Sequence, residues 1–174
     1  SAKIYDFIWD TYCDWYIELT KTRLNGEDEG AKLAAENVLC YVLLRILELL
    51  HPFMPFITEE IWQALPHEGD YLIRAKWPEY HSAFDFRAEE QAMEAVKDAI
   101  SAVRARRAEM NVPPSKKAQM IIVSDHAEDY RLGEHFIKRM AYASELTVTD
   151  ASPADLTGLV TVVTHGANVY LPLA

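Results

Sequence analysis

The fourteen residues Arg104–Lys117, with the sequence RARRAEMNVPPSKK, divide this chain of 174 residues into two parts of different character. Pro113 and Pro114 lack the amide hydrogen that a helix interior needs, so a helix that approaches them must stop. Helical periodicity dominates before the prolines, whereas short β-branched or apolar runs follow them. We therefore predict a mainly α protein, with a helical bundle over residues 1–112 and a small α+β module over residues 113–174.

Four helices are predicted in the first part from the spacing of the hydrophobic residues. They span Lys3–Arg23, Ala31–Leu50, a short segment that begins after Ile57 and closes at Pro66, and about Asp85–Met110. The second of these is apolar nearly all round, which is typical of the most buried helix in a bundle. Thr58 is the predicted N-cap of the short helix, because its hydroxyl accepts hydrogen bonds from free backbone amides.

Short strands and one helix are predicted after the prolines. The strands are Gln119–Val123, Leu146–Val148, Leu159–Val163 and Val169–Leu171, and the helix is Ala127–Ala143. The sequence His165-Gly166-Ala167 lies between the last two strands and predicts a hairpin turn. The second part of the chain is therefore predicted to be a small α+β unit.

The charge of the chain changes sign locally. The chain has 17 Lys and Arg against 27 Asp and Glu, which gives a net charge of −10. An acidic chain neither coats nucleic acid nor lies on an anionic membrane, so any RNA contact must be a local patch. Arg104–Lys117 holds five of the 17 cations and a single acid, Glu109. This stretch is the predicted site for a polyanion.

Four cations of this stretch are the predicted RNA-binding residues: Arg104, Arg107, Lys116 and Lys117. Arg107 continues the hydrophobic stripe that reaches Val103 on the preceding helix, where water alone would be a poor partner. The guanidinium fork matches the oxygens of a phosphate backbone. The alternative is a solvated helix end, at which Arg104, Arg106 and Arg107 favourably meet the negative end of the helix dipole.

Metal and cofactor sites are not predicted. Cys13 and Cys40 lack the CxxC spacing of a zinc site, and the histidines share no ligand spacing. Glu48-Leu-Leu-His51 has the Glu-x-x-His spacing of a di-iron bundle, but the sequence holds no second copy, which favours a capping or packing role for His51. The sequence has neither a glycine-rich phosphate loop nor a nucleophile turn, so no catalytic residue and no bound cofactor are expected.

Membrane and secretion signals are not predicted either. The longest apolar run, Val38–Leu50, is interrupted by Arg45 and Glu48 and is shorter than the roughly 20 residues that span a bilayer. Asp6 and Asp10 interrupt the N-terminal apolar pattern, which disfavours a signal peptide. The two cysteines fit a reducing compartment, so we expect a cytoplasmic protein.

An acidic ladder lies on the first predicted helix. Its members are Asp6, Asp10, Asp14 and Glu18. Because they are four residues apart on a helix, neighbouring charges repel by roughly 0.2–0.5 kcal/mol per pair. The plain interpretation is a face in contact with solvent. The functional alternative is a face that docks on cations of a larger molecule.

Three segments carry a resemblance to a known family. They are Cys13–Leu19 (CDWYIEL), His51–Trp62 (HPFMPFITEEIW) and Arg107–Lys117 (RAEMNVPPSKK). In this order they resemble the valyl-tRNA synthetases, which are class I aminoacyl-tRNA synthetases. The second segment is shared in similar form with the isoleucyl and leucyl relatives, whereas the first and third point to the valine family. The resemblance covers essentially the whole chain.

The resemblance implies an anticodon-binding helical bundle, truncated at its start, followed by a small α+β module that leads toward a coiled coil missing from this chain. Members of the family join valine to its tRNA and use ATP. The family's ATP-binding signatures and editing domain are absent from this sequence, so the isolated chain is expected to have no enzymatic activity. The expected partners are a tRNA with the valine anticodon and the catalytic domain of the same polypeptide.

The resemblance and the charge pattern together give one functional hypothesis and one alternative. In the first, Arg104 and Arg107 contact phosphates of the anticodon stem or stack on loop bases, while Lys116 and Lys117 add phosphate contacts. In the alternative, the bundle braces the catalytic core through protein contacts, with the acidic ladder as its docking face. A strongly salt-dependent affinity for RNA would separate the two.

Overall fold

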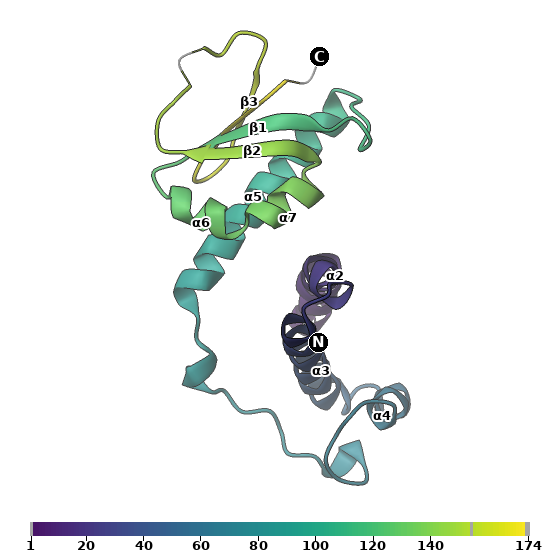
Figure 1. Cartoon of the computed structure of the whole chain (residues 1–174). Helices are drawn as coiled ribbons and strands as arrows, with labels where there is room; N and C mark the ends of the chain where they lie inside the picture. Colours follow the sequence, from purple (N-terminus) through teal and green to yellow (C-terminus); the bar gives the residue numbers. More distant parts are fainter. Residues whose placement is uncertain (1, 154, 173–174) are drawn as a thin grey trace. The chain divides into compact units, whose positions relative to one another are not determined.

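The computed structural model of the chain describes residues 2–153 and 155–172. The chain forms two compact units, Ser1–Ser82 and Ala83–Ala174, which are named the helical unit and the sheet unit. Figure 1 labels their helices and strands. This division lies well before the predicted domain boundary between residues 112 and 113. The reason is that the long helix of residues 87–109 packs with the later helices of residues 127–140 and with the strand of residues 160–163.

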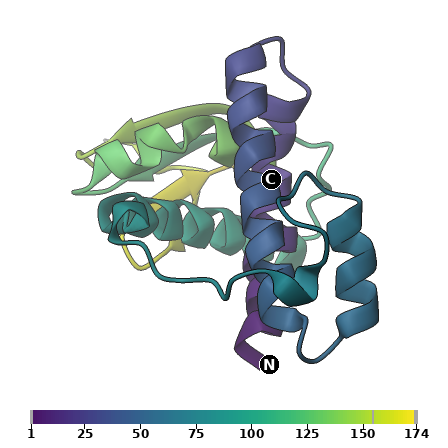
Figure 2. The ribbon, with the colours of Figure 1, turned by 90° about the horizontal axis from the view of Figure 1, so that it is seen from below.

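Two long antiparallel helical segments form most of the helical unit (Figure 2). The first runs through α1 (Ala2–Asp6), η1 (Phe7–Ile17) and α2 (Glu18–Leu24), and the second is α3 (Glu29–Leu50). α1 and α2 both contact α3. Tyr12 Oη also donates a hydrogen bond of 2.9 Å to Leu39 O across the pair. The predicted helices over Lys3–Arg23 and Ala31–Leu50 are thus confirmed in position.

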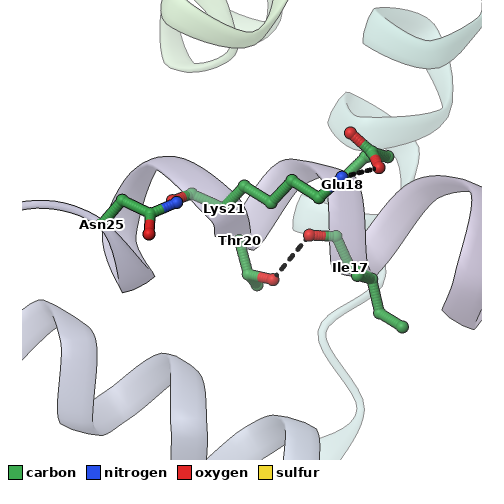
Figure 3. Close-up of polar contacts among 5 residues, drawn as sticks. All are labelled: Ile17, Glu18, Thr20, Lys21 and Asn25. Atoms are coloured by element: carbon green, nitrogen blue, oxygen red, sulfur yellow. Dashed lines mark hydrogen bonds and ion pairs between the residues drawn. The ribbon is translucent and has the colours of Figure 1, made fainter.

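The turn between the two segments is held by side chains at the helix ends. Asn25 Nδ2 donates a hydrogen bond of 2.9 Å to Lys21 O at the end of α2. At the start of α3, Asp28 Oδ1 accepts one of 3.0 Å from Ala31 N. Figure 3 shows Asn25 beside Lys21, whose ammonium pairs with Glu18 one turn earlier. Asn and Asp suit these positions because their short side chains reach backbone groups that a helix end leaves without partners.

The middle of the first segment departs from the predicted geometry. Phe7–Ile17 forms a π-helix, a wider helix in which each amide bonds the carbonyl five residues earlier. Ile8, Tyr12 and Leu19 recur at the spacing of a hydrophobic stripe on one face of an α-helix, but only Tyr12 and Leu19 are buried, whereas Ile8 is half-buried. The stripe therefore reaches the core at fewer positions than a period of 3.6 residues predicts.

A short helix and a small hydrophobic cluster complete the helical unit. α4 (Pro55–Gln63) and η2 (Leu72–Arg74) follow α3 along the chain. The cluster is formed by Leu47, Trp62 and Leu72. The prediction that Thr58 caps the short helix is wrong, because Thr58 lies inside α4 and its hydroxyl donates 2.8 Å to Met54 O. The helix begins earlier, at Pro55, whose fixed φ suits the first helical position.

α3 is less buried than its sequence predicts. Its buried residues are Ala35, Ile46, Leu47 and Glu48. Leu33, Val38 and Tyr41 of the same helix are exposed, so α3 is not enclosed on every side within the helical unit. A helix that is apolar on every side needs neighbours on every side to be buried. Within the helical unit, α3 contacts the first segment and α4.

Among the described residues, the sheet unit contains a four-stranded sheet with helices on one face (Figures 1 and 2). The strands β1 (Ala118–Val123), β2 (Ala143–Thr149), β3 (Val160–Val163) and β4 (Asn168–Leu171) lie in the order β2-β1-β4-β3. β1 pairs with β2 in parallel, whereas β4 runs antiparallel to both β1 and β3. The helices are α5 (Arg87–Glu109), preceded by η3 (Ser82–Phe84), then α6 (Ala127–Leu132) and α7 (Glu134–Met140).

The four predicted strands and the hairpin turn are confirmed. Ile122 of β1 lies opposite Val169 of β4, which lies opposite Val162 of β3, and all three side chains are buried. Between β3 and β4, Thr164 N donates a hydrogen bond of 2.9 Å to Ala167 O and closes the turn. The sheet therefore turns one continuous hydrophobic row toward the core.

The single helix predicted over Ala127–Ala143 is wrong, because the structure divides it at Gly133 into α6 and α7. At this point the backbone approaches α5 closely. A Cβ added to Gly133 would lie 2.5 Å from Val96 Cγ2, which is closer than real atoms come. Glycine is therefore required by packing against α5, and the helix direction changes where that contact is made.

Candidate functional site

Arg107 ends the hydrophobic stripe of α5 and lies inside the sheet unit. The residue is only 2% exposed. Its Nη2 donates a hydrogen bond of 3.0 Å to Pro113 O and a second one to Lys116 O. The guanidinium carbon lies 5.6 Å from the centre of the Tyr142 ring, within range of a cation–π contact. Arg107 is thus on the inward line of the helix, where the periodicity predicts it.

The predicted contact between Arg107 and RNA is not supported by this geometry. A phosphate needs exposed donors, but this guanidinium is covered and bonds two main-chain carbonyls. Its Nη1 is buried without a hydrogen-bond partner among the described residues. The sequence indicates that the cation points inward, but it does not reveal that carbonyls of the following loop take the place of phosphate oxygens.

The loop after α5 is folded into two consecutive turns. Val112 N donates a hydrogen bond of 2.9 Å to Arg107 O, and Asn111 has a φ of 55°, a left-handed conformation that Asn tolerates better than most residues. After the prolines, Lys116 N donates 3.1 Å to Pro113 O. The side chain of Arg107 reaches carbonyls of the second turn, so it ties that turn to the end of α5.

Three of the predicted site residues, Arg104, Lys116 and Lys117, are exposed. Together with exposed Arg106 they are named the basic edge. Arg106 is compensated by Glu109 through an ion pair of 2.9 Å. Arg104 and Lys117, by contrast, form no ion pair with any residue that the structure describes. Arg107 links the helix that carries Arg104 to the loop that carries both lysines. The backbone positions of these three cations are therefore fixed relative to one another.

Other classes of site find less support. Within residues 2–153 and 155–172, no group of three His, Cys, Asp or Glu side chains could hold a metal ion. His51 Nδ1 instead lies 2.8 Å from Thr58 Oγ1, which is a packing role of the kind predicted for it. In the same part of the chain, no helix has the length and apolar character needed to cross a membrane.

The acidic ladder lies on the outside of the helical unit. Asp6, Asp10 and Asp14 are exposed. Glu18 pairs with Lys21, a contact that can be followed in Figure 3. This arrangement agrees with a face in contact with solvent, and it also leaves the ladder accessible to a cationic partner.

One candidate site is not predicted from the sequence. A hollow of about 370 Å³ opens in the helical unit beside Glu48 and His51. The carboxylate of Glu48 is buried, and this burial raises the pKa of Glu48 above its ordinary value. The positive charge of nearby Arg45 partly opposes the rise. The available signal in the sequence is a carboxylate inside the longest apolar run, because such a position forces the group into a hydrophobic surrounding.

Comparison with known families gives a match over most of the chain. Residues 1–122 match the family described as "Anticodon-binding domain of tRNA ligase". The match includes the helical unit, α5 and the basic edge. It ends within β1, so the rest of the sheet lies outside it.

Curated relatives extend the similarity to essentially the full chain. The valine–tRNA ligase of Staphylococcus carnosus is 44% identical over 174 residues, which covers 98% of this chain and 20% of that protein. The valine–tRNA ligase of Clostridium acetobutylicum is 45% identical over 176 residues, covering 99% of this chain and 20% of that protein. The valine–tRNA ligase of Bacillus cereus is 45% identical over 177 residues, which covers 100% of this chain and 20% of that protein. The chain thus spans a fifth of the length of these relatives.

Proposed function

This chain belongs to the family of anticodon-binding domains of tRNA ligases, and on that premise we propose that it binds the anticodon stem and loop of a tRNA for valine. The basic edge is the proposed contact surface. Its support is one observation: Arg104, Lys116 and Lys117 are exposed, and the loop that carries the lysines is fixed by buried Arg107.

The chemistry of the basic edge suits RNA better than an acidic protein surface. Phosphate contacts from Arg and Lys supply the part of the affinity for nucleic acid that does not depend on sequence. The residues around the edge belong to an acidic chain, so RNA is repelled elsewhere and attracted to one place. Such a surface would bind a tRNA in one orientation, whereas a uniformly basic surface would bind it in many.

Within a whole ligase, the proposed role is positioning. A tRNA held by its anticodon presents its distant acceptor end to a catalytic domain of the same polypeptide, where valine and ATP would react. This chain itself would carry no catalytic residue and no ATP site. A cytoplasmic location follows from the same proposal, because translation takes place there.

The test is a titration of the chain with a tRNA that carries the valine anticodon, at low and at moderate salt. Each phosphate contact contributes roughly 0.7–0.9 to the slope of log affinity against log salt. Replacing Arg104, Lys116 and Lys117 by alanine should therefore weaken binding about tenfold or more and flatten the slope by about two units. A tRNA with one changed anticodon base reports whether bases are read as well.

The matched control replaces three exposed arginines outside the basic edge, Arg23, Arg74 and Arg87, by alanine. It changes the net charge by the same amount, so a purely nonspecific effect would appear equally in both triple variants. Equal losses in the two variants, or no loss in either, would contradict the proposed surface.

A second candidate function is a brace that holds the catalytic core through protein contacts. It is favoured by one observation, the exposed acidic ladder of the helical unit. Under this alternative the chain would bind RNA weakly, with equal affinity for matched and changed anticodons. The same titration therefore distinguishes the two functions.

A further inference from the structure

A hollow of about 370 Å³ lies in the helical unit, between the end of α3, the start of α4 and the segment around η2. Its walls are apolar at Pro52, Pro55 and Leu72. Trp77 lines it as well and is 59% exposed, so its ring remains accessible. Glu48 and His51 supply the polar part of the lining. Apolar walls with a few convergent polar groups are the usual composition of a binding pocket.

Glu48 has an unused hydrogen-bond acceptor. The residue is 8% exposed. Its Oε1 pairs with Arg45 Nη2 at 2.6 Å, but its buried Oε2 has no partner among the described residues. A carboxylate oxygen removed from water without a donor is costly, and this cost is relieved when a donor enters.

His51 also lines the hollow and has a second unused acceptor. Thr58 Oγ1 has one proton and gives it to Met54 O at 2.8 Å, so Thr58 accepts the bond of 2.8 Å from His51 Nδ1. In the neutral imidazole, the proton is therefore on Nδ1 and the lone pair is on Nε2. This Nε2 is buried and has no partner among the described residues.

The matching ligand must carry several donors and fit beside an indole ring. A guanidinium group meets these conditions, because it is planar, presents five N–H donors and stacks on aromatic faces. An ammonium group donates as well, but it lacks the planar fork. Arg45 and Lys76 are the cations beside Glu48. Arg45 already pairs with Oε1 of Glu48, which leaves Oε2. The carboxylate therefore offers one oxygen to each of two guanidinium groups.

The charge of the surroundings favours a protein over a nucleic acid as the source of this group. Residues 1–82 contain 7 Lys and Arg and 14 Asp and Glu, a net charge of −7. A nucleobase amine could donate to the same acceptors, but it would bring a phosphodiester into this negative field. An arginine on a polypeptide brings the complementary charge instead.

We propose that the hollow beside Glu48, His51 and Trp77 is a socket for an arginine side chain of a polypeptide segment that docks on the helical unit. This site is separate from the basic edge and does not depend on the proposed tRNA function. Its energetic basis is the pairing of two unused buried acceptors with a stacked guanidinium. A single side chain is a small ligand, so its isolated affinity is expected to be on the order of millimolar.

The test uses blocked amino acids as probes and NMR signals of Trp77 and His51 as the readout. N-acetyl-arginine amide should shift the indole N–H signal of Trp77 and the ring signals of His51. N-acetyl-citrulline amide has nearly the same shape without the charge and should bind at least about tenfold more weakly. Cytidine monophosphate probes the nucleotide alternative.

Variants make the assignment specific. Glu48→Gln keeps the shape of the side chain and should weaken the arginine probe at least about tenfold, since it removes the charge that the guanidinium pairs with. Glu68→Gln, on the rim of a neighbouring hollow, is the matched control and should leave binding unchanged. Unshifted signals elsewhere in the spectrum verify that each variant remains folded. The affinity for tRNA should be the same in Glu48→Gln and in the unmodified chain.

Three results would overturn the proposal. The first is an absence of shifts at Trp77 and His51 with the arginine probe. The second is equal binding of the arginine and citrulline probes. The third is a stronger response to cytidine monophosphate than to arginine, which would assign the hollow to a nucleotide.

Discussion

The two units bury their side chains to very different degrees. Among the ten largest fully buried side chains of the described residues, nine belong to the sheet unit, and the tenth is Thr58 of the helical unit. Most of the large hydrophobic side chains that are exposed lie in the helical unit. Phe56 has the largest exposed fraction among them, 90%. The sheet unit encloses its own core, whereas the helical unit presents apolar surface of the kind that marks an interaction site.

This contrast teaches where stability and recognition are expected to reside. The basic edge is built on the unit with the enclosed core, so its cations are held by a firm scaffold. The socket and the acidic ladder are on the unit with the smaller core. All four tryptophans, Trp9, Trp15, Trp62 and Trp77, are in the helical unit. Tryptophan fluorescence therefore reports the helical unit alone, and the comparison can be measured within one chain.

The largest expected effect comes from the core of the sheet unit. Ile100 is completely buried, so Ile100→Ala should lower the free energy of unfolding of the sheet unit by about 2–5 kcal/mol. Urea unfolding followed by circular dichroism measures this loss. The fluorescence midpoint of the helical unit should hardly move. Leu33→Ala, at an exposed position of α3, is the control and should cost less than about 0.5 kcal/mol. Similar losses in both variants would remove the contrast between the units.

Arg107→Ala should have the next largest effect. It removes the bonds to Pro113 O and Lys116 O, and charged hydrogen bonds of this kind contribute about 1.5–3 kcal/mol. The sheet unit should lose about this much stability, and tRNA binding should weaken because the lysines of the basic edge are no longer fixed. Arg104→Ala is the matched variant, which should weaken tRNA binding without loss of stability. An Arg107→Ala protein of full stability would contradict the role given to this residue.

Gly133→Ala tests the close approach between α5 and the point where α6 meets α7. The new methyl group would meet Val96 Cγ2 at 2.5 Å, and such overpacking costs about 1–3 kcal/mol. The double variant Gly133→Ala/Val96→Ala frees the space, so its loss should be smaller than the sum of the two single losses. Additive losses in circular dichroism unfolding would show that the contact is not the reason for the glycine.

Tyr12→Phe is expected to have the smallest effect, in the helical unit. It removes the hydrogen bond to Leu39 O, which contributes about 1 kcal/mol. Tyr5→Phe, at an exposed position, is the control and should have no measurable effect. Urea unfolding followed by tryptophan fluorescence near neutral pH measures both variants.

The same tyrosine gives a pH dependence of known sign. Burial raises the pKa of Tyr12 from 10.0 to about 12. The folded protein therefore holds this proton more tightly than the unfolded chain, so the stabilisation is complete below pH 10.0 and is lost as the pH rises toward about 12. Tyr12→Phe should lose less stability over this range than the unmodified chain. Parallel curves for the two proteins would contradict the assignment.

The sequence predicts periodic features well because they depend on neighbours along the chain. The four strands, the long helix before the double proline and the inward direction of Arg107 follow from spacing alone. Such predictions are less exact where two nearby residues could each begin the same helix. Thr58 is a residue type that often caps a helix start. Here the helix already begins at Pro55, three residues earlier, because proline suits the first helical position.

Features that depend on distant residues are not predicted from the sequence. Glycine is needed at position 133, where α6 ends, because Val96, 37 positions earlier, occupies the space that a Cβ would take. The partners of Arg107 are carbonyls of a loop whose path is set by two turns. The exposure of α3 depends on how many elements surround it, and hydrophobicity shows only that it needs partners. The same holds for the socket, which is lined from three segments of the chain.

The most direct test of the basic edge as an RNA surface is hydrogen exchange of the chain with and without a tRNA that carries the valine anticodon. We expect slower exchange in residues 104–117, with little change in the acidic first helix, residues 2–24, because negative charge there repels RNA. Protection confined to the helical unit, with residues 104–117 unchanged at saturating tRNA, would contradict it.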